Sequence, residues 1–211
     1  MTIHRQTVVR TILGFALIGG LACSTLAIAE ATGALQLPFK YASYKSAQHA
    51  GSFIHFRMVH RKLGGHMASN IDGVVKAFSV TGHLEKEILD HAAVSFRVQD
   101  MDTDNGTRDH KMTTDSLKSS SHPMIRVIFN KPLNLGSQTV PGTMEILGNK
   151  KPVTLPITIK KTGTTYQANG KTTVTFSGLG VPKPGFISDA IASVDDAITI
   201  TYQIVANEDQ F

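Results

Sequence analysis

The sequence predicts an all-β protein whose strands close into one eight-stranded antiparallel β-barrel. Apolar residues recur at every second position through most of residues 50–206, as in strands that have one covered face. Turn-forming residues separate these runs, and no long stretch shows the 3.6-residue period of a helix. Eight such strands close most economically into a barrel, because closure removes exposed sheet edges.

The first four expected strands come before residue 130. In the first, Ile54, Phe56 and Met58 alternate with His55 and Arg57. The next three have as inward residues Phe78, Val80 and Leu84, then Val94, Phe96 and Val98, then Ile125, Val127 and Phe129. Between the third and the fourth, residues 113–123 are expected to hold a short helical turn that ends at Pro123.

The last four expected strands complete the barrel. Their inward residues are Met144 and Ile146, then Val153, Leu155, Ile157 and Ile159, then Val174 and Phe176, and finally Ile198, Ile200, Tyr202 and Ile204. Hairpin connections are expected at Gly136-Ser137, Thr162-Gly163 and Asn169-Gly170, since such pairs favour tight turns. No repeat or low-complexity linker divides residues 30–211, so we expect one domain.

Residues 1–29 are expected to be a secretory signal peptide that is cleaved after Ala29 or Ala31. Positive charge precedes the apolar run TILGFALIGGLAC, and small residues follow in LAIAEA. A retained membrane anchor is the first alternative, but it needs about 20 consecutive apolar residues. Acylation at Cys23 is the second, although Gly20 stands where such signals usually carry leucine. We therefore expect export to the periplasm.

Cleavage would leave a folded, mildly basic chain without a thiol. The composition, 41% hydrophobic and 18% charged, is that of a globular protein. Cys23 is the only cysteine, so the mature chain would have no disulfide. Loss of Arg5 and Arg10 reduces the formal net charge from +5 to about +3. The remaining basic residues are scattered, and we expect no nucleic-acid partner.

The segment DMDTDNGTRDHKM, residues 100–112, has the composition of a calcium loop but not its spacing. An EF-hand loop that started at Asp100 would need glycine at its sixth position and glutamate at its twelfth. Asn105 and Lys111 occupy these two positions. We expect no calcium site.

No zinc site, catalytic motif or cofactor-binding motif is expected either. A catalytic zinc site usually begins from a close pair of histidines, whereas His55 and His60 lie five apart on an expected strand and face opposite ways. The sequence has no G-x-S-x-G motif to place a nucleophilic serine on a sharp strand-to-helix turn. We therefore expect a protein that is not an enzyme.

The order of five segments resembles the YceI-like family of secreted polyisoprenoid-binding proteins. These segments are GSFIHFRMVH, NIDGVVKAFSVTGHL, AAVSFRVQDMDTDNGTRDHKM, SSSHPMIRVIF and VPGTMEILGNKKPVTLPITI, within residues 44–206. The most specific part is the acid-Thr-x-Asn turn, with Arg108-Asp109 shortly after it and then the proline of HPMIRVIF. The resemblance implies a lipocalin-like barrel around an elongated apolar tunnel. Such a tunnel takes a long-chain lipid, often an isoprenoid quinone or an isoprenoid phosphate.

A periplasmic carrier of such a lipid is therefore the leading hypothesis. The tunnel-lining residues inferred from the alternation are Ile54, Phe56, Met58, Phe78, Val80, Phe96, Val98, Val127, Phe129, Ile146 and Phe176. The alternative is a barrel filled with side chains that docks to a membrane redox partner, since an eight-stranded interior can also be packed solid. A homodimer is left open.

Arg108 and His110 have two alternative roles. Residues 102–105 are expected to form a turn in which side-chain oxygens accept hydrogen bonds from nearby backbone N–H groups. Arg108, with Asp109 and His110, would then tie the following segment to the barrel. In the alternative, Arg108 or His110 contacts the head group of a ligand. On a strand the two would share a face.

Overall fold

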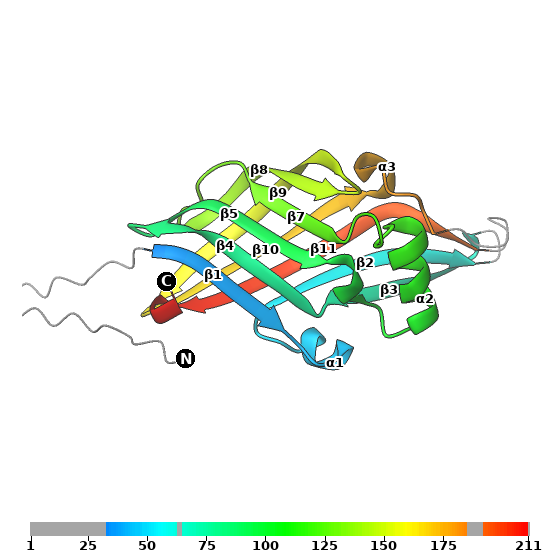
Figure 1. Cartoon of the computed structure of the whole chain (residues 1–211), viewed down its shortest axis with the longest axis horizontal. Helices are drawn as coiled ribbons and strands as arrows, with labels where there is room; N and C mark the ends of the chain where they lie inside the picture. Colours follow the sequence, from blue (N-terminus) through cyan, green and yellow to red (C-terminus); the bar gives the residue numbers. More distant parts are fainter. Residues whose placement is uncertain (1–32, 63–64, 185–191, 211) are drawn as a thin grey trace, which may run out of the picture.

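The computed structural model describes residues 33–62, 65–184 and 192–210 as an all-β fold with a few short helices (Figure 1). The predicted signal peptide, with Cys23, lies outside the described residues. The strands are β1 (Gly33–Lys40), β2 (Phe53–Lys62), β3 (Met67–Val75), β4 (Ala77–Glu85), β5 (Ile88–Arg97), β6 (Met101–Asp102), β7 (Met124–Phe129), β8 (Gly136–Ile146), β9 (Asn149–Thr162), β10 (Thr165–Thr175) and β11 (Ala192–Asn207).

These strands form one curled antiparallel sheet in the order β1-β4-β5-β7-β8-β9-β10-β11-β2-β3-β6. The expected number of eight strands is wrong, because the described sheet has eleven. All eight expected strands are present. The three additional ones are β1, β3 and β6, and β6 has only two residues.

The sheet curls back on itself at a corner formed by Lys76. This residue alone separates β3, which pairs with β2, from β4, which pairs with β5. Its N–H donates to the carbonyl oxygen of Asp100, and its own carbonyl accepts from the N–H of Tyr41, both at 2.8 Å. The sheet is therefore a curled half-barrel around one interior, and the expected closure is not complete, because the described end strands β1 and β6 do not pair with each other.

The tight turns follow the local sequence in part. Lys86 and Glu87, between β4 and β5, and Leu147 and Gly148, between β8 and β9, all have positive φ, as a type I′ turn requires. The expected turn at Thr162-Gly163 is present between β9 and β10. Two expected turns are wrong. Gly136 and Ser137 begin β8 and pair with β9, while Asn169 and Gly170 lie within β10 and pair with β11.

Short helices flank the curled sheet, and α2 and α3 both lie toward the right in Figure 1. They are α1 (Tyr44–Gln48), α2 (Gly106–Lys111) and α3 (Phe176–Leu179), with a π-helical turn at Met112–Ser116 and 3₁₀ turns at Val98–Asp100 and Glu208–Gln210. The helical segment expected within residues 113–123 therefore begins earlier, at Gly106. None of the helices in the described ranges is long and apolar enough to cross a membrane.

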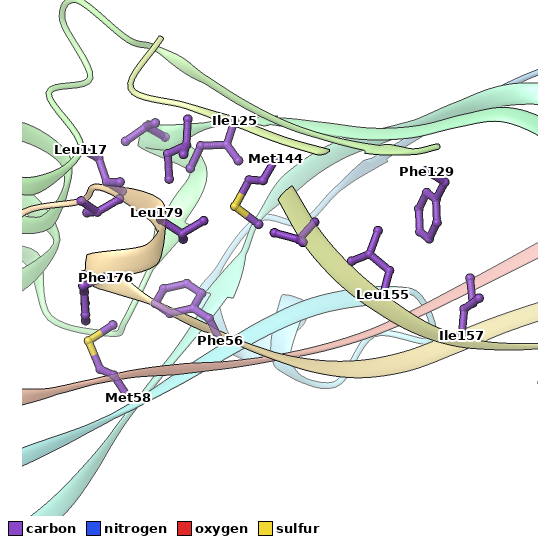
Figure 2. Packing of buried hydrophobic residues seen from close by; sticks show 14 of the residues in the cluster. Phe56, Met58, Leu117, Ile125, Phe129, Met144, Leu155, Ile157, Phe176 and Leu179 are labelled. Carbon is purple, nitrogen blue, oxygen red and sulfur yellow. The ribbon is translucent and has the colours of Figure 1, made fainter. Parts of the chain in front are cut away.

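The apolar residues inside the curled sheet form two clusters. The larger contains Phe56 and Met58 of β2, with residues of β7, β8, β9 and α3. The smaller is centred on Leu35 and Leu37 of β1 and Phe78 of β4. Figure 2 shows part of the larger cluster, with Phe129 and Ile157 farther along the barrel from α3.

Candidate functional site

The larger cluster surrounds a cavity of about 440 Å³. Its walls come from strands on opposite sides of the barrel and from α3, which places Phe176 and Leu179 beside Met58 and Phe56 (Figure 2). The apolar lining residues are Phe56, Met58, Ile71, Phe96, Met101, Met112, Leu117, Ile125, Met144, Ile146, Val174, Phe176, Leu179, Val181, Pro184, Val194, Ile198 and Ile200. The volume falls within the roughly 300–1,000 Å³ of ligand pockets.

A smaller cavity of about 90 Å³ lies in the part of the barrel covered by β1. It is lined by Val80, Phe129 and Tyr166, among others. Phe96, Ile200 and Tyr202 pack against both apolar clusters and so lie between the two cavities. The hydroxyl of Tyr202 donates to the carbonyl oxygen of Pro156 at 2.6 Å, and burial raises the pKa of this tyrosine to about 12. A partly buried hydrogen bond therefore holds Tyr202 in place between the cavities.

The structure distributes the eleven inferred tunnel residues over three places. The larger cavity is lined by Phe56, Met58, Phe96, Ile146 and Phe176. The smaller one is lined by Val80 and Phe129. Four line neither cavity: Ile54 and Phe78 are buried in the smaller cluster, Val98 is buried in the larger cluster, and Val127 packs against that larger cluster.

The larger cavity reaches solvent beside α2. Asn105, Thr107 and Lys111 line it and are exposed, and Arg108 lines it while half-buried. The side chain of Asn105 caps α2 by accepting from the N–H of Arg108 at 3.0 Å. The segment that sequence analysis singled out therefore forms the rim of the cavity.

Thr103 joins Arg108 and Asp109 of this rim through hydrogen bonds and is only 3% exposed. Its hydroxyl donates to the carboxylate of Asp109 at 2.5 Å, and its N–H donates to the same oxygen at 3.0 Å. Arg108 donates from Nε to the Thr103 hydroxyl at 2.7 Å and from Nη2 to the Thr103 carbonyl at 2.6 Å. The expected turn is also present, since the N–H of Asp104 donates to Asp102 at 2.8 Å.

His110 is exposed and does not line the cavity. His110 would share a face with Arg108 on a strand, but the segment is instead the helix α2. On a helix, residues three or four apart are neighbours, whereas residues two apart point to different sides. Lys111, three positions after Arg108, therefore shares its face and lines the rim.

The lining also includes residues that were not predicted from the sequence, among them Lys111, Leu117, Leu179 and Val181. Lys111 and Leu117 follow from the helical course of residues 106–116, for which Asn105 as an N-cap is the only local signal. Leu179 and Val181 belong to a helix of four residues and the chain just after it. So short a helix leaves no periodic signal.

His60 of β2 also lines the larger cavity. Burial lowers the pKa of its imidazole, and the nearby cations Lys62 and Arg108 lower it further. Within the described chain, no group of three or more His, Cys, Asp or Glu residues could hold a metal ion. The described lining therefore combines a largely apolar wall with a rim that has basic and hydroxyl groups.

Comparisons with known proteins agree with this architecture. A family model described as the YceI-like domain matches residues 45–206. BcnA of Burkholderia cenocepacia is 19% identical with a TM-score of 0.60, over 74% of this chain and 96% of that chain. The YceI protein of Campylobacter jejuni is 19% identical with a TM-score of 0.56, over 66% of this chain and 85% of that one.

A third similar structure is a polyisoprenoid binding domain from Saccharophagus degradans, implicated in plant cell wall breakdown. It is 12% identical with a TM-score of 0.53, over 74% of this chain and 93% of that one. At such identities the likeness establishes the fold. No curated protein matches the sequence.

Proposed function

Because the chain belongs to the YceI-like family, we propose that it is a periplasmic carrier that binds a long-chain apolar lipid, of the isoprenoid type, inside its curled sheet. The observation that carries this proposal is the cavity of about 440 Å³, whose lining is largely apolar and which reaches solvent beside α2. The similar domain from Saccharophagus degradans, named as polyisoprenoid binding, supports the choice of lipid class.

The proposed mechanism is passive binding rather than catalysis. An apolar tail that leaves water for the cavity gains about 25 cal/mol for each Å² of apolar area that is buried. Aromatic and methionine side chains suit such a tail, and Met58, Met101, Met112 and Met144 all line the cavity. Methionine adapts its shape to irregular partners. The polar residues at the rim would then contact the head group.

Extraction of the natively purified protein with organic solvent, followed by mass spectrometry, tests this proposal. We expect about one long-chain lipid per chain, as a cavity of this size accepts a single small ligand. An extract without lipid, from protein that also fails to take up added isoprenoid lipid, would contradict the carrier function. It would favour the alternative of a docking module for a membrane redox partner.

A pair of variants on β7 tests whether the lipid occupies the larger cavity. Ile125 is buried and lines this cavity, whereas its neighbour Arg126 is exposed. Ile125→Trp places a large ring in the space proposed for the lipid, so retained lipid should fall several-fold while the fold persists. Arg126→Trp is the matched control and should retain lipid as the wild type does. Equal loss in both variants would place the lipid elsewhere.

The proposed export of the protein to the periplasm is tested by its mass. The intact mass of protein recovered from a periplasmic fraction should correspond to a chain that begins at Glu30 or Thr32. A diacylglycerol-modified Cys23 at the N-terminus would instead establish a lipid-anchored protein.

A further inference from the structure

The rim of the larger cavity carries two basic side chains without acidic partners. Arg108 and Lys111 both line it, three residues apart on α2. Among the described residues of the lining there is no aspartate or glutamate. Neither Arg108 nor Lys111 forms an ion pair with any other described residue, whereas Arg57, Arg61 and Lys161 each contact a carboxylate. No described carboxylate therefore pairs directly with either cation, and Asp109 reaches Arg108 only through the Thr103 hydroxyl.

Arg108 is held in a fixed position. Its Nε and one N–H of Nη2 donate to Thr103, which is itself held by Asp109. The guanidinium has further N–H donors, on Nη1 and Nη2, that remain available to a ligand. A guanidinium fixed in this way matches the oxygens of a carboxylate or phosphate without a large loss of side-chain entropy.

Binding of a lipid tail would strengthen the preference of these two cations for an anionic head group over a neutral one. A tail that fills the cavity removes water from the rim, and a cation that loses water without gaining a partner is costly. A neutral head group would leave the Lys111 ammonium and the remaining N–H groups of Arg108 in this state, while an anionic head group would pair with both side chains. Ser116 also lines this cavity, is 2% exposed, and adds a hydroxyl donor to its lining.

We propose that the rim formed by Arg108 and Lys111 selects lipids with an anionic head group, of the phosphate or carboxylate type, over neutral lipids with the same tail. This inference rests on the proposed carrier function. It adds the charge of the ligand and the residues that recognise it.

Three probes with one isoprenoid tail separate the head group from the tail: geranylgeraniol, geranylgeranoic acid and geranylgeranyl phosphate. Their dissociation constants for the delipidated protein are measured at low and at high salt. We expect the phosphate or the acid to bind at least about tenfold more tightly than the alcohol, since a charged hydrogen bond contributes roughly a tenfold factor. Salt should weaken only the anionic probes.

Lys111→Gln is the main variant, because the exposed side chain of Lys111 has no hydrogen-bonding or ionic partner among the described residues, so its replacement should leave the fold unchanged. We expect it to weaken the preferred anionic probe a few-fold, as for a partly exposed ion pair, and to leave the alcohol unchanged. Lys118→Gln is the control, because Lys118 is exposed and does not line the cavity; it should change the affinity for neither probe.

Arg108→Lys keeps the positive charge but loses the planar guanidinium that can bind two oxygens at once. Its affinity for the anionic probe should therefore fall roughly tenfold.

The outcomes separate the two proposals. Equal binding of all three probes by the wild type, unchanged by Lys111→Gln, would overturn anionic selection and leave the carrier function intact. Binding of none of the probes would overturn the carrier function, and anionic selection with it. Tighter binding of the phosphate than of the acid would identify a phosphate head group, and the reverse order a carboxylate.

Discussion

At residue 170 the backbone of β10 passes so close to its neighbours that a side chain has no space. A Cβ added to Gly170 would lie 2.1 Å from the carbonyl oxygen of Pro156 and 2.4 Å from the hydroxyl oxygen of Tyr202. These two oxygens are also joined by the hydrogen bond that fixes Tyr202 between the two cavities. The glycine is thus needed for close packing, although its sequence context, Asn-Gly, is typical of a turn.

Gly170→Ala should therefore lower the free energy of unfolding by about 1–3 kcal/mol, the usual cost of overpacking. Backbone must move, because the carbonyl of Pro156 is not a flexible side chain. The measurement is urea denaturation, with Gly51→Ala as control, since nothing lies within 4 Å of a Cβ added at Gly51. Equal stability of the two variants would contradict the close contact at position 170.

Among the elements, α3 is short but well capped, and it carries part of the cavity wall. Its N-cap Thr175 accepts a hydrogen bond from the N–H of Gly178 at 3.0 Å, and the N–H of Ser177 donates to Asp196 of β11 at 3.1 Å. Gly180 ends the helix in the left-handed region, with φ of 70°. A helix of four residues has little stability of its own, so these caps position Phe176 and Leu179.

Thr175→Val should reduce stability by about 1 kcal/mol, because valine keeps the β-branched shape but cannot cap the helix. Thr173→Val on the same strand is the control, since Thr173 is exposed and makes no side-chain hydrogen bond in the described structure. Thermal or urea unfolding measures both. If the two substitutions change stability equally, the cap does not stabilise α3.

How well each element could be predicted depends on whether it has one covered face. The eight expected strands do, and their alternation identified them. In β3, by contrast, the first four residues, Met67–Asn70, are all exposed, so apolar and polar residues do not alternate there. β6 is too short for any pattern. Strand geometry was assumed for Arg108 and His110, because nothing but the N-cap Asn105 marks α2.

At the scale of the whole molecule, the sequence predicts which residues face inward but not how the interior is filled. Phe96 and Val98 are two positions apart, so the alternation predicts that both face inward. Phe96 lines the larger cavity. Val98 instead begins a 3₁₀ turn after β5 and is 1% exposed in the packed core. A local break in one strand decides this difference. Whether inward side chains meet or leave a cavity depends on the curvature of the sheet, which alternation does not encode.

Because the two cavities lie one after the other along the barrel, we expect binding to depend on the length of the lipid tail. A short isoprenoid tail can remain in the larger cavity, whereas a long tail must pass Phe96 and Tyr202 and enter the part of the barrel that contains Val80. Val80→Trp fills that narrower space. It should therefore weaken binding of a long probe such as geranylgeraniol several-fold and leave a short probe such as geraniol nearly unchanged.

His83→Trp is the control for Val80→Trp, because His83 is an exposed residue of the same strand. Val80→Trp should also cost stability, by about 1–3 kcal/mol, since the smaller cavity has only about 90 Å³. Affinities for both probes and urea denaturation are therefore measured together. If Val80→Trp lowers the affinity for both probes equally, its effect comes from destabilisation of the whole fold. If it weakens neither, the tail ends within the larger cavity and the wall at Tyr202 closes the binding site.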